Sequence, residues 1–411
     1  MMSESFPPAN QRPGMRVRAG RAMVVVACVL ALAGCGTIKG WFGGGPESEK
    51  TKAKKAGEPA ELVEFSASTE ASRIWSASAG KGEGHLGLRQ SPTVADGRVY
   101  AAAVDGGVRA FDLQTGASAW RHDTDLRLGS GPGVGDGLVV VGSLKGEVIA
   151  LDAATGAERW QAKVPNEVIA APVIGQGMVI VRSNDGRVTA FDAANGERRW
   201  FWNRELPSLT VRGSDSAVLG PGIVFVGNDD GTLAALSLAD GRQMWDVPVA
   251  QPDGRTELDR MADIDGSPII DGTVLYASSY RQSTLAIDAP SGRPIWGSDH
   301  GGSNRPALSI DKLLVSDRNG SVWGLDRSSG NASWEQPALA RRSLSGVAVH
   351  GDYAVVGDFD GYLHWLNLSD GSFAVRKRAG RASITGAPVV ADGVLVVQNV
   401  DGDLTAWRVG Q

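Results

Sequence analysis

The sequence predicts an all-β protein, an eight-bladed β-propeller of four-stranded antiparallel blades whose ring is closed by an N-terminal strand. Glycine supplies 55 of the 411 residues, roughly twice its usual share of about 7%, so tight turns are frequent and a helical bundle is excluded. One motif returns with a period of 40 residues. Turn dipeptides divide each period into four short strands, and four strands in about 40 residues are typical of a propeller blade.

Residues 1–34 are expected to be a lipoprotein signal peptide rather than part of the fold. Four arginines precede the apolar run at residues 22–30, which is the order of a secretory n-region and h-region. The run is shorter than the roughly 20 residues that span a bilayer. It leads to Leu32-Ala33-Gly34-Cys35, which resembles the bacterial lipobox and so implies cleavage before Cys35 and its lipidation. A signal peptide with an incidental cysteine stays open, as does a start at Met1 or Met15.

Residues 35–70 are expected to hold the lipidated cysteine and a flexible tether, because glycine, proline, lysine and glutamate occur there without apolar periodicity. Gly36 follows the cysteine, and by resemblance to lipoprotein sorting signals this favours the periplasmic face of the outer membrane. The two cysteines are Cys28 and Cys35. Cleavage would therefore leave one acylated cysteine and no disulfide, although an oxidising periplasm permits one.

Residues 71–411 are expected to form the propeller. Segments 110–120, 150–160 and 190–200 align without gaps on the pattern Ala-x-Asp-x-x-Thr/Asn-Gly-x-x-x-Trp. Asp-Gly and Asn-Gly dipeptides, which suit hairpin turns, recur at one place in the repeats. Seven repeats are complete, and an eighth stops one strand short after Trp407.

The missing strand is predicted at residues 73–77, where Trp75 takes the position of the tryptophan in the other repeats. It would pair with the last strand of the eighth repeat and close the ring without a covalent link. An open solenoid is the competing architecture. It would expose apolar faces on both terminal repeats, and neither end has a polar capping repeat.

The repeated motif resembles the tryptophan-docking repeat of the pyrroloquinoline-quinone (PQQ) propellers. The resemblance implies a structural role for these tryptophans, in which the indole packs on the neighbouring blade while its N–H reaches a carbonyl oxygen. The seventh repeat departs from the pattern, with Val375 in the tryptophan position. The residues expected to dock the blades are Trp75, Trp120, Trp160, Trp200, Trp245, Trp296 and Trp334.

The lipobox, the tether and eight such blades together resemble the BamB lipoproteins of the outer-membrane β-barrel assembly machinery, over the whole chain. The resemblance implies a non-catalytic scaffold that assists the folding and insertion of outer-membrane proteins. It implies BamA and the other Bam complex subunits as partners, with unfolded outer-membrane proteins as a further candidate, and membrane attachment by the lipid anchor only.

Segments 206–213 and 256–265 look like the two loops by which that family contacts BamA, which implies contact roles for Leu209, Val211, Arg212, Asp263 and Asp265. Val211 stands where a leucine is expected. Independently, the tryptophan spacing grows from 40 to 45 and then to 51 across these segments. Both insertions follow an outer strand, so they emerge side by side on one face, where binding residues concentrate. The alternative is that Arg212 and the aspartates pair with one another or face solvent.

The sequence contains few features of known enzyme active sites. Quinone-dependent dehydrogenases share this repeat, but their vicinal cysteine pair is missing, and residues 263–266 lack the later glutamate of a calcium loop. No Gly-x-Ser-x-Gly or His-Glu-x-x-His motif occurs, and a net charge of −5 does not favour nucleic acid. We therefore expect no catalysis, cofactor or metal. A quinone-binding periplasmic oxidoreductase and a generic ligand-binding propeller stay open, as does a small molecule in the central channel.

Overall fold

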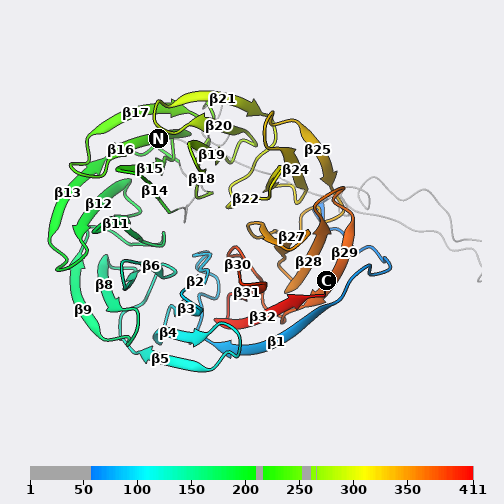
Figure 1. The fold of residues 1–411 in the computed structure, drawn as a ribbon, viewed down its shortest axis with the longest axis horizontal. Coiled ribbons are helices and arrows are strands. Elements are labelled where there is room, and N and C mark those ends of the chain that lie inside the picture. Colours follow the sequence, from blue (N-terminus) through cyan, green and yellow to red (C-terminus); the bar gives the residue numbers. More distant parts are fainter. Residues whose placement is uncertain (1–56, 210–215, 252–260, 265, 411) are drawn as a thin grey trace, which may run out of the picture. The chain divides into compact units, whose positions relative to one another are not determined.

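Eight four-stranded antiparallel sheets form a closed ring (Figure 1). The computed structural model describes residues 57–209, 216–251, 261–264 and 266–410. The expected signal peptide, Cys35 and the first part of the expected tether lie outside these residues. The predicted eight-bladed propeller of antiparallel four-stranded blades is confirmed.

Seven blades use four consecutive strands each, and the eighth combines strands from both ends of the described chain. Blade 1 holds β2 (Thr93–Ala95), β3 (Arg98–Ala103), β4 (Gly107–Asp112) and β5 (Ser118–His122). Blade 2 holds β6 (Gly133–Gly135), β7 (Leu138–Gly142), β8 (Glu147–Asp152) and β9 (Glu158–Lys163). Blade 3 holds β10 (Val173–Gly175), β11 (Met178–Arg182), β12 (Arg187–Asp192) and β13 (Arg198–Asn203). Blade 4 holds β14 (Val218–Gly220), β15 (Ile223–Gly227), β16 (Thr232–Ser237) and β17 (Gln243–Pro248). Blade 5 holds β18 (Ile269–Asp271), β19 (Val274–Ser278), β20 (Thr284–Asp288) and β21 (Arg293–Ser298). Blade 6 holds β22 (Ala307–Leu308), β23 (Lys312–Ser316), β24 (Val322–Asp326) and β25 (Ala332–Gln336). Blade 7 holds β26 (Ala348–His350), β27 (Tyr353–Gly357), β28 (Tyr362–Asn367) and β29 (Phe373–Arg378). Blade 8 holds β30 (Val389–Ala391), β31 (Val394–Gln398), β32 (Asp403–Val409) and β1 (Ala71–Ser78).

The middle strands of a blade are buried because neighbouring blades cover both of their faces. All five residues of β7 are buried, whereas the outer strand β9 fully buries only Trp160. Continuous apolar sequence is typical of strands covered on both faces. The core is therefore a series of clusters between blades, such as the one where Tyr100 of blade 1 meets Val139 and Leu151 of blade 2.

The ring closes through β1, which pairs antiparallel with β32 from Ala71 opposite Val409 to Ser78 opposite Asp403. The two strands lie next to each other at the bottom of the ring, drawn in blue and red (Figure 1). The predicted closure by an N-terminal strand is confirmed. Backbone hydrogen bonds, rather than a covalent link, hold the two ends together.

Seven of the blade junctions share one contact, between an outer-strand tryptophan and a glycine turn of the next blade. Each indole Nε1–H donates to a backbone carbonyl oxygen of that blade at 2.8–3.0 Å. Each ring also covers the turn glycine: a Cβ added at Gly156 would lie 2.5 Å from the ring of Trp120. The seven tryptophans are Trp75, Trp120, Trp160, Trp200, Trp245, Trp296 and Trp334.

The junction between blades 7 and 8 is built differently. Val375 of β29 takes the tryptophan position, and no turn joins the last two strands of blade 8 because β32 and β1 are far apart in sequence. Trp365 and Trp407 fill this junction, with ring centroids 6.1 Å apart. A docking tryptophan would find no turn glycine to cover here, which accounts for the valine.

Residues 58–70, which we call the N-terminal strap, lie against the propeller, whereas the sequence predicted a flexible tether up to residue 70. The backbone N–H of Ser68 donates to the carbonyl oxygen of Ala374 in β29 at 2.9 Å. Phe65 stacks on Phe373 with ring centroids 5.1 Å apart, and Leu62 packs against the core cluster of blades 6 and 7. Apolar side chains therefore draw this segment onto the protein, and the predicted tether ends too late.

Candidate functional site

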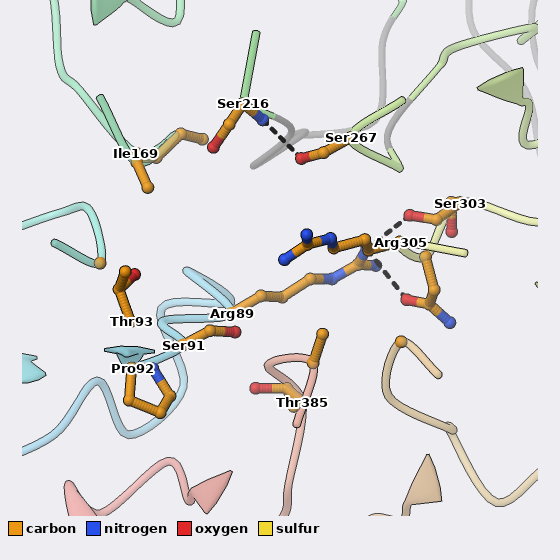
Figure 2. Close-up of a pocket in the computed structure, with 15 residues that line it drawn as sticks. Arg89, Ser91, Pro92, Thr93, Ile169, Ser216, Ser267, Ser303, Arg305 and Thr385 are labelled. Atoms are coloured by element: carbon orange, nitrogen blue, oxygen red, sulfur yellow. Dashed lines mark hydrogen bonds between the residues drawn. The ribbon is translucent and has the colours of Figure 1, made fainter. Parts of the chain in front are cut away.

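The described parts of the two connections that hold the insertions lie on one face of the propeller. Residues 204–217 connect β13 to β14, and residues 249–268 connect β17 to β18. The second connection packs against the turn between the middle strands of blade 4, since Ala250 N–H donates to Gly231 O and Ile264 N–H donates to Asn228 O. The first begins next to the equivalent turn of blade 3, where a Cβ added at Gly186 would lie 2.8 Å from Arg204 O. The insertions also contact each other, because the backbone N–H of Ser216 donates to Ser267 Oγ at 2.8 Å (Figure 2). The face therefore presents two linked loops from adjacent blades.

The structure describes two of the five predicted contact residues. The Leu209 side chain is 40% exposed, and Leu206 beside it in sequence is 41% exposed. Val211, Arg212 and Asp265 lie outside the described residues. An apolar contact role remains a proposal for Leu209.

Asp263 differs from the exposed contact residue that the sequence predicted, because it is 0% exposed. Its neighbours Ala262 and Ile264 are 1% and 0% exposed, and Ile264 joins the core cluster between blades 4 and 5. The Asp263 carbonyl oxygen accepts from the backbone N–H of Tyr280 at 2.8 Å. Packing of Ile264 draws the chain inward, so Asp263 belongs to the base of the second insertion.

Ion pairs that sequence reasoning missed brace the base of the first insertion. Arg204 lies 2.6 Å from Asp230 and 3.2 Å from Asp246, and Arg182 lies 2.6 Å from Asp229. The partners come from different blades, 26 to 47 residues apart. No local pattern marks such pairs, so the sequence held no signal for them.

Three arginines in or next to blade 7 hydrogen-bond to the strap. Arg341, Arg342 and Arg376 donate to the carbonyl oxygens of Glu58, Ala60 and Val63, respectively, at 2.7–3.0 Å. These bonds satisfy strap backbone groups that have no strand partner. The strap is thereby held to the protein by three charged donors.

Two of these arginines also contact a buried Asp358–His364 pair. Asp358 Oδ2 accepts from Arg342 Nε at 2.8 Å and from His364 Nε2 at 3.0 Å. Burial by itself raises the pKa of Asp358, but hydrogen bonds from His364, Tyr362 N–H and Arg342 outweigh it and hold that pKa below its ordinary value. Desolvation lowers the pKa of His364 more than Asp358 raises it. A neutral ring can then accept at Nδ1 from Arg376 Nε, 3.1 Å away.

The inner ends of all eight blades line a central cavity of about 130 Å³. Each blade places there the residue that stands two positions before the start of its innermost strand. Seven of these residues are small: serine at Ser91, Ser216 and Ser267, and glycine or alanine at Gly131, Ala171, Gly346 and Ala387. The equivalent residue of blade 6 is Arg305, and Arg89 reaches the same cavity (Figure 2). Aligning the repeats at this position would have identified Arg305.

In the described ranges, no group of three or more His, Cys, Asp or Glu side chains could hold a metal ion. The same ranges contain no helix of the length and apolarity that crossing a bilayer requires. His350 and His364 hydrogen-bond inside blade 7, and His300 stacks on Trp323 with centroids 3.9 Å apart. These three histidines have structural contacts.

Comparison with known proteins places the chain in a family. The family model described as outer membrane protein assembly factor BamB matches residues 30–127, 105–336 and 334–409. The outer membrane protein assembly factor BamB of Xanthomonas campestris pv. campestris is 59% identical over 401 residues, which cover 95% of this chain and 98% of that protein. The BamB of Pseudomonas aeruginosa is 40% identical over 385 residues, covering 94% and 98%.

Solved structures agree with this assignment. The crystal structure of BamB from Moraxella catarrhalis matches with a TM-score of 0.75 and 28% identity, covering 82% of this chain and 100% of that chain. A europium-containing methanol dehydrogenase matches with a TM-score of 0.68 and 16% identity, covering 82% and 93%, a likeness that shows the fold alone. The chain therefore belongs to the BamB family of outer membrane protein assembly factors.

Proposed function

We propose that this protein is a non-catalytic assembly factor for outer-membrane proteins, a lipid-anchored scaffold on the periplasmic face of the outer membrane that binds BamA. The observation that carries the proposal is the 59% identity, over 95% of the chain, to a protein named as an outer membrane protein assembly factor. Association with the outer membrane follows from the same family name. Direct contact with unfolded clients is a further candidate role.

The binding surface in this proposal is the face that carries the two linked insertions. Leu206 and Leu209 offer exposed apolar area there, and Val211, Arg212 and Asp265 belong to the same insertions in sequence. An apolar centre beside charged groups provides both contact area and orientation, and a few residues carry most of the affinity of such interfaces. Asp263 is not proposed as a contact, because its burial gives it a structural role.

Anchoring through Cys35 completes the proposal. The strap begins at Glu58, so 22 residues lie between it and Cys35. A chain of that length extends at most about 80 Å, and a flexible one has a root-mean-square span of roughly 25–30 Å. The anchor would thus keep the propeller within reach of a membrane-embedded partner.

The size of the central cavity does not favour a drug-sized cofactor bound on the propeller axis. A volume of about 130 Å³ is well below the roughly 300–1,000 Å³ of pockets that bind drug-sized ligands. The likeness to dehydrogenase structures rests on 16% identity and supports a common fold only. The quinone-dependent oxidoreductase is therefore not favoured.

Co-purification of BamA from detergent-solubilised outer membranes tests the proposed surface. Arg212→Glu and Leu209→Asp should each weaken BamA binding, and loss of one such central contact costs about 2 kcal/mol or more, roughly thirtyfold in affinity. Arg242→Glu is the matched control, because Arg242 is exposed and follows the turn glycine at the opposite end of the blade. Arg187 is less suitable, since its guanidinium stacks over Phe201 at 4.9 Å. Unchanged BamA recovery with both loop variants, at unchanged circular dichroism, would place the binding surface elsewhere.

A further inference from the structure

The central cavity contains a cationic side chain at a position where the other blades have small residues. Seven blades present serine, glycine or alanine at the channel position, and blade 6 presents Arg305. Figure 2 shows the Arg305 side chain extending into the middle of the cavity. Of the eight equivalent positions around the channel, the one in blade 6 therefore carries a positive charge.

Arg305 has no counter-charge in the part of the chain that the structure describes. Its guanidinium makes no hydrogen bond or ion pair with described residues. Desolvation in the channel lowers its pKa, although the group stays charged at neutral pH. The Arg305 side chain is exposed within the channel, so its guanidinium donors are open to a ligand that enters from solvent.

Arg89 brings a second cation to the same cavity. Its backbone is left-handed, with φ +54°, a strained conformation that non-glycine residues keep mainly where a site requires it. Its Nη1 donates to Ser303 O at 3.1 Å and to Asn304 Oδ1 at 3.4 Å, which are neutral acceptors. The described lining residues include no carboxylate.

Glu83 lies behind this loop rather than in the cavity lining. Its Oε2 accepts from the backbone N–H groups of Leu88 and Arg89, and its Oε1 accepts from Thr385 Oγ1 at 3.2 Å. Burial raises the pKa of Glu83. Its oxygens are thus already bonded to the loop that carries Arg89, and among the described residues the cavity lining itself holds two arginines and no carboxylate.

We propose that the central channel binds a small oxyanion of the phosphate or sulfate class through Arg305 and Arg89. A guanidinium presents its N–H donors in a planar fork that matches such oxygens. Ser91, in the same segment as Arg89, and Ser216 and Ser267 from blades 4 and 5 line the same cavity (Figure 2). Ser267 Oγ already accepts from Ser216 N–H, so its own proton can turn toward an anion. This site goes beyond the assembly function and lies apart from the exposed leucines of the proposed partner surface.

The cavity volume sets the size of the ligand. A cavity of about 130 Å³ is below the roughly 300–1,000 Å³ of pockets that hold drug-sized ligands. It therefore suits a small ion such as phosphate or sulfate, which has five non-hydrogen atoms.

Isothermal titration of the full-length protein in detergent with inorganic phosphate, at constant ionic strength against chloride, tests this site directly. We expect saturable one-to-one binding, with at least a tenfold loss of affinity in Arg305→Gln and no loss in the exposed control Arg242→Gln. A hundredfold excess of phosphate over its Kd should raise the melting temperature of the wild type by about 3 °C or more. The same excess should leave the melting temperature of Arg305→Gln unchanged.

The melting temperature measured without phosphate distinguishes an arginine that binds a ligand from one that stabilises the fold. In chloride alone, Arg305→Gln should melt close to the wild-type temperature, because the exposed side chain makes no hydrogen bond or ion pair with described residues and surface substitutions away from such contacts change stability little. A lower melting temperature in chloride, with no response of either protein to phosphate, would overturn the proposal. Absence of phosphate and sulfate binding by the wild type would do the same.

Parallel titrations with sulfate and glycerol 3-phosphate identify the source of the anion. Tighter binding of the inorganic ions supports a free anion as the ligand. Tighter binding of the ester supports a phosphate monoester, such as a headgroup fragment, whose glycerol extends along the channel. Binding of all three that survives Arg305→Gln and Arg89→Gln would refute the assignment to these arginines.

Discussion

Replacing Gly156 by alanine tests whether the turn glycines are required by the neighbouring indole. Gly156 and Gly137 lie in the same blade with φ +73° and φ +74°. A Cβ at Gly156 would lie 2.5 Å from the ring of Trp120, whereas nothing lies within 4 Å of a Cβ at Gly137. Gly137→Ala therefore isolates the backbone cost, and Gly156→Ala adds the steric cost.

The geometry gives the size of the difference. A left-handed alanine costs about 1–2 kcal/mol, and this is the expected loss for Gly137→Ala. At Gly156 the indole must also retreat from 2.5 Å to an ordinary contact of 3.4 Å or more, which overpacking data put at about 1–3 kcal/mol. That movement stretches the 2.9 Å bond from Trp120 Nε1 to Ala153 O, a further loss of about 1 kcal/mol. Gly156→Ala should therefore cost about 3–6 kcal/mol in all.

Urea unfolding followed by circular dichroism measures both free energies of unfolding. Trp120→Ala supplies the decisive background, because it removes the ring that the new methyl group would strike. In that background Gly156→Ala should cost only the backbone term of about 1–2 kcal/mol, a non-additivity that a double-mutant cycle detects. Equal losses for Gly156→Ala and Gly137→Ala in the wild-type background would refute the reasoning.

Cys35→Ala should leave the protein uncleaved or soluble, because buried acyl chains contribute about 0.8 kcal/mol per CH₂ to membrane binding; a mature-sized variant that still floats with outer membranes would contradict the anchor. Deleting residues 36–57 should not change thermal unfolding. Deleting residues 36–78 removes the strap, β1 and the Trp75 contact, and should lower the melting temperature by several degrees, since loss of one buried tryptophan costs about 3–5 kcal/mol; equal melting curves would argue against closure by β1. Lowering the pH from 7 to 5 should destabilise the protein, because desolvation lowers the pKa of His350 and His364 in the fold. As the pH falls below their ordinary value of 6.5, the unfolded chain binds protons first and its free energy falls relative to the folded state. A urea midpoint independent of pH over that range would show that these histidines do not control stability.

The fold could be predicted because its information is local and repeated. Six outer strands carry a tryptophan four residues after the turn glycine, and the structure shows the same pair of residue types meeting across seven junctions. The absent strand after Trp407 and the isolated segment around Trp75 were enough to predict the closing strand β1. Even the exception at Val375 has a cause in the chain order, since blade 8 has no turn there for an indole to cover.

The candidate site was only partly predictable. The lengthened tryptophan spacing identified both insertions, because extra residues can only enter where the blade does not need them. It could not show that Asp263 is buried, since the burial depends on Ile264 packing against strands of two blades. The ion pairs of Arg204 likewise join residues that only the ring brings together.

By itself the sequence determined the number of blades, the closing strand and the position of the insertions, because each follows from spacing along a repeating chain. Only the tertiary structure decided that Arg305 and Arg89 share one cavity and that the strap lies on blade 7. These contacts join residues as far apart as Arg89 and Asn304, or Phe65 and Phe373. A periodic sequence specifies the contacts that every blade repeats. Contacts that occur at only one place in the ring depend on which side chains the closed ring brings together.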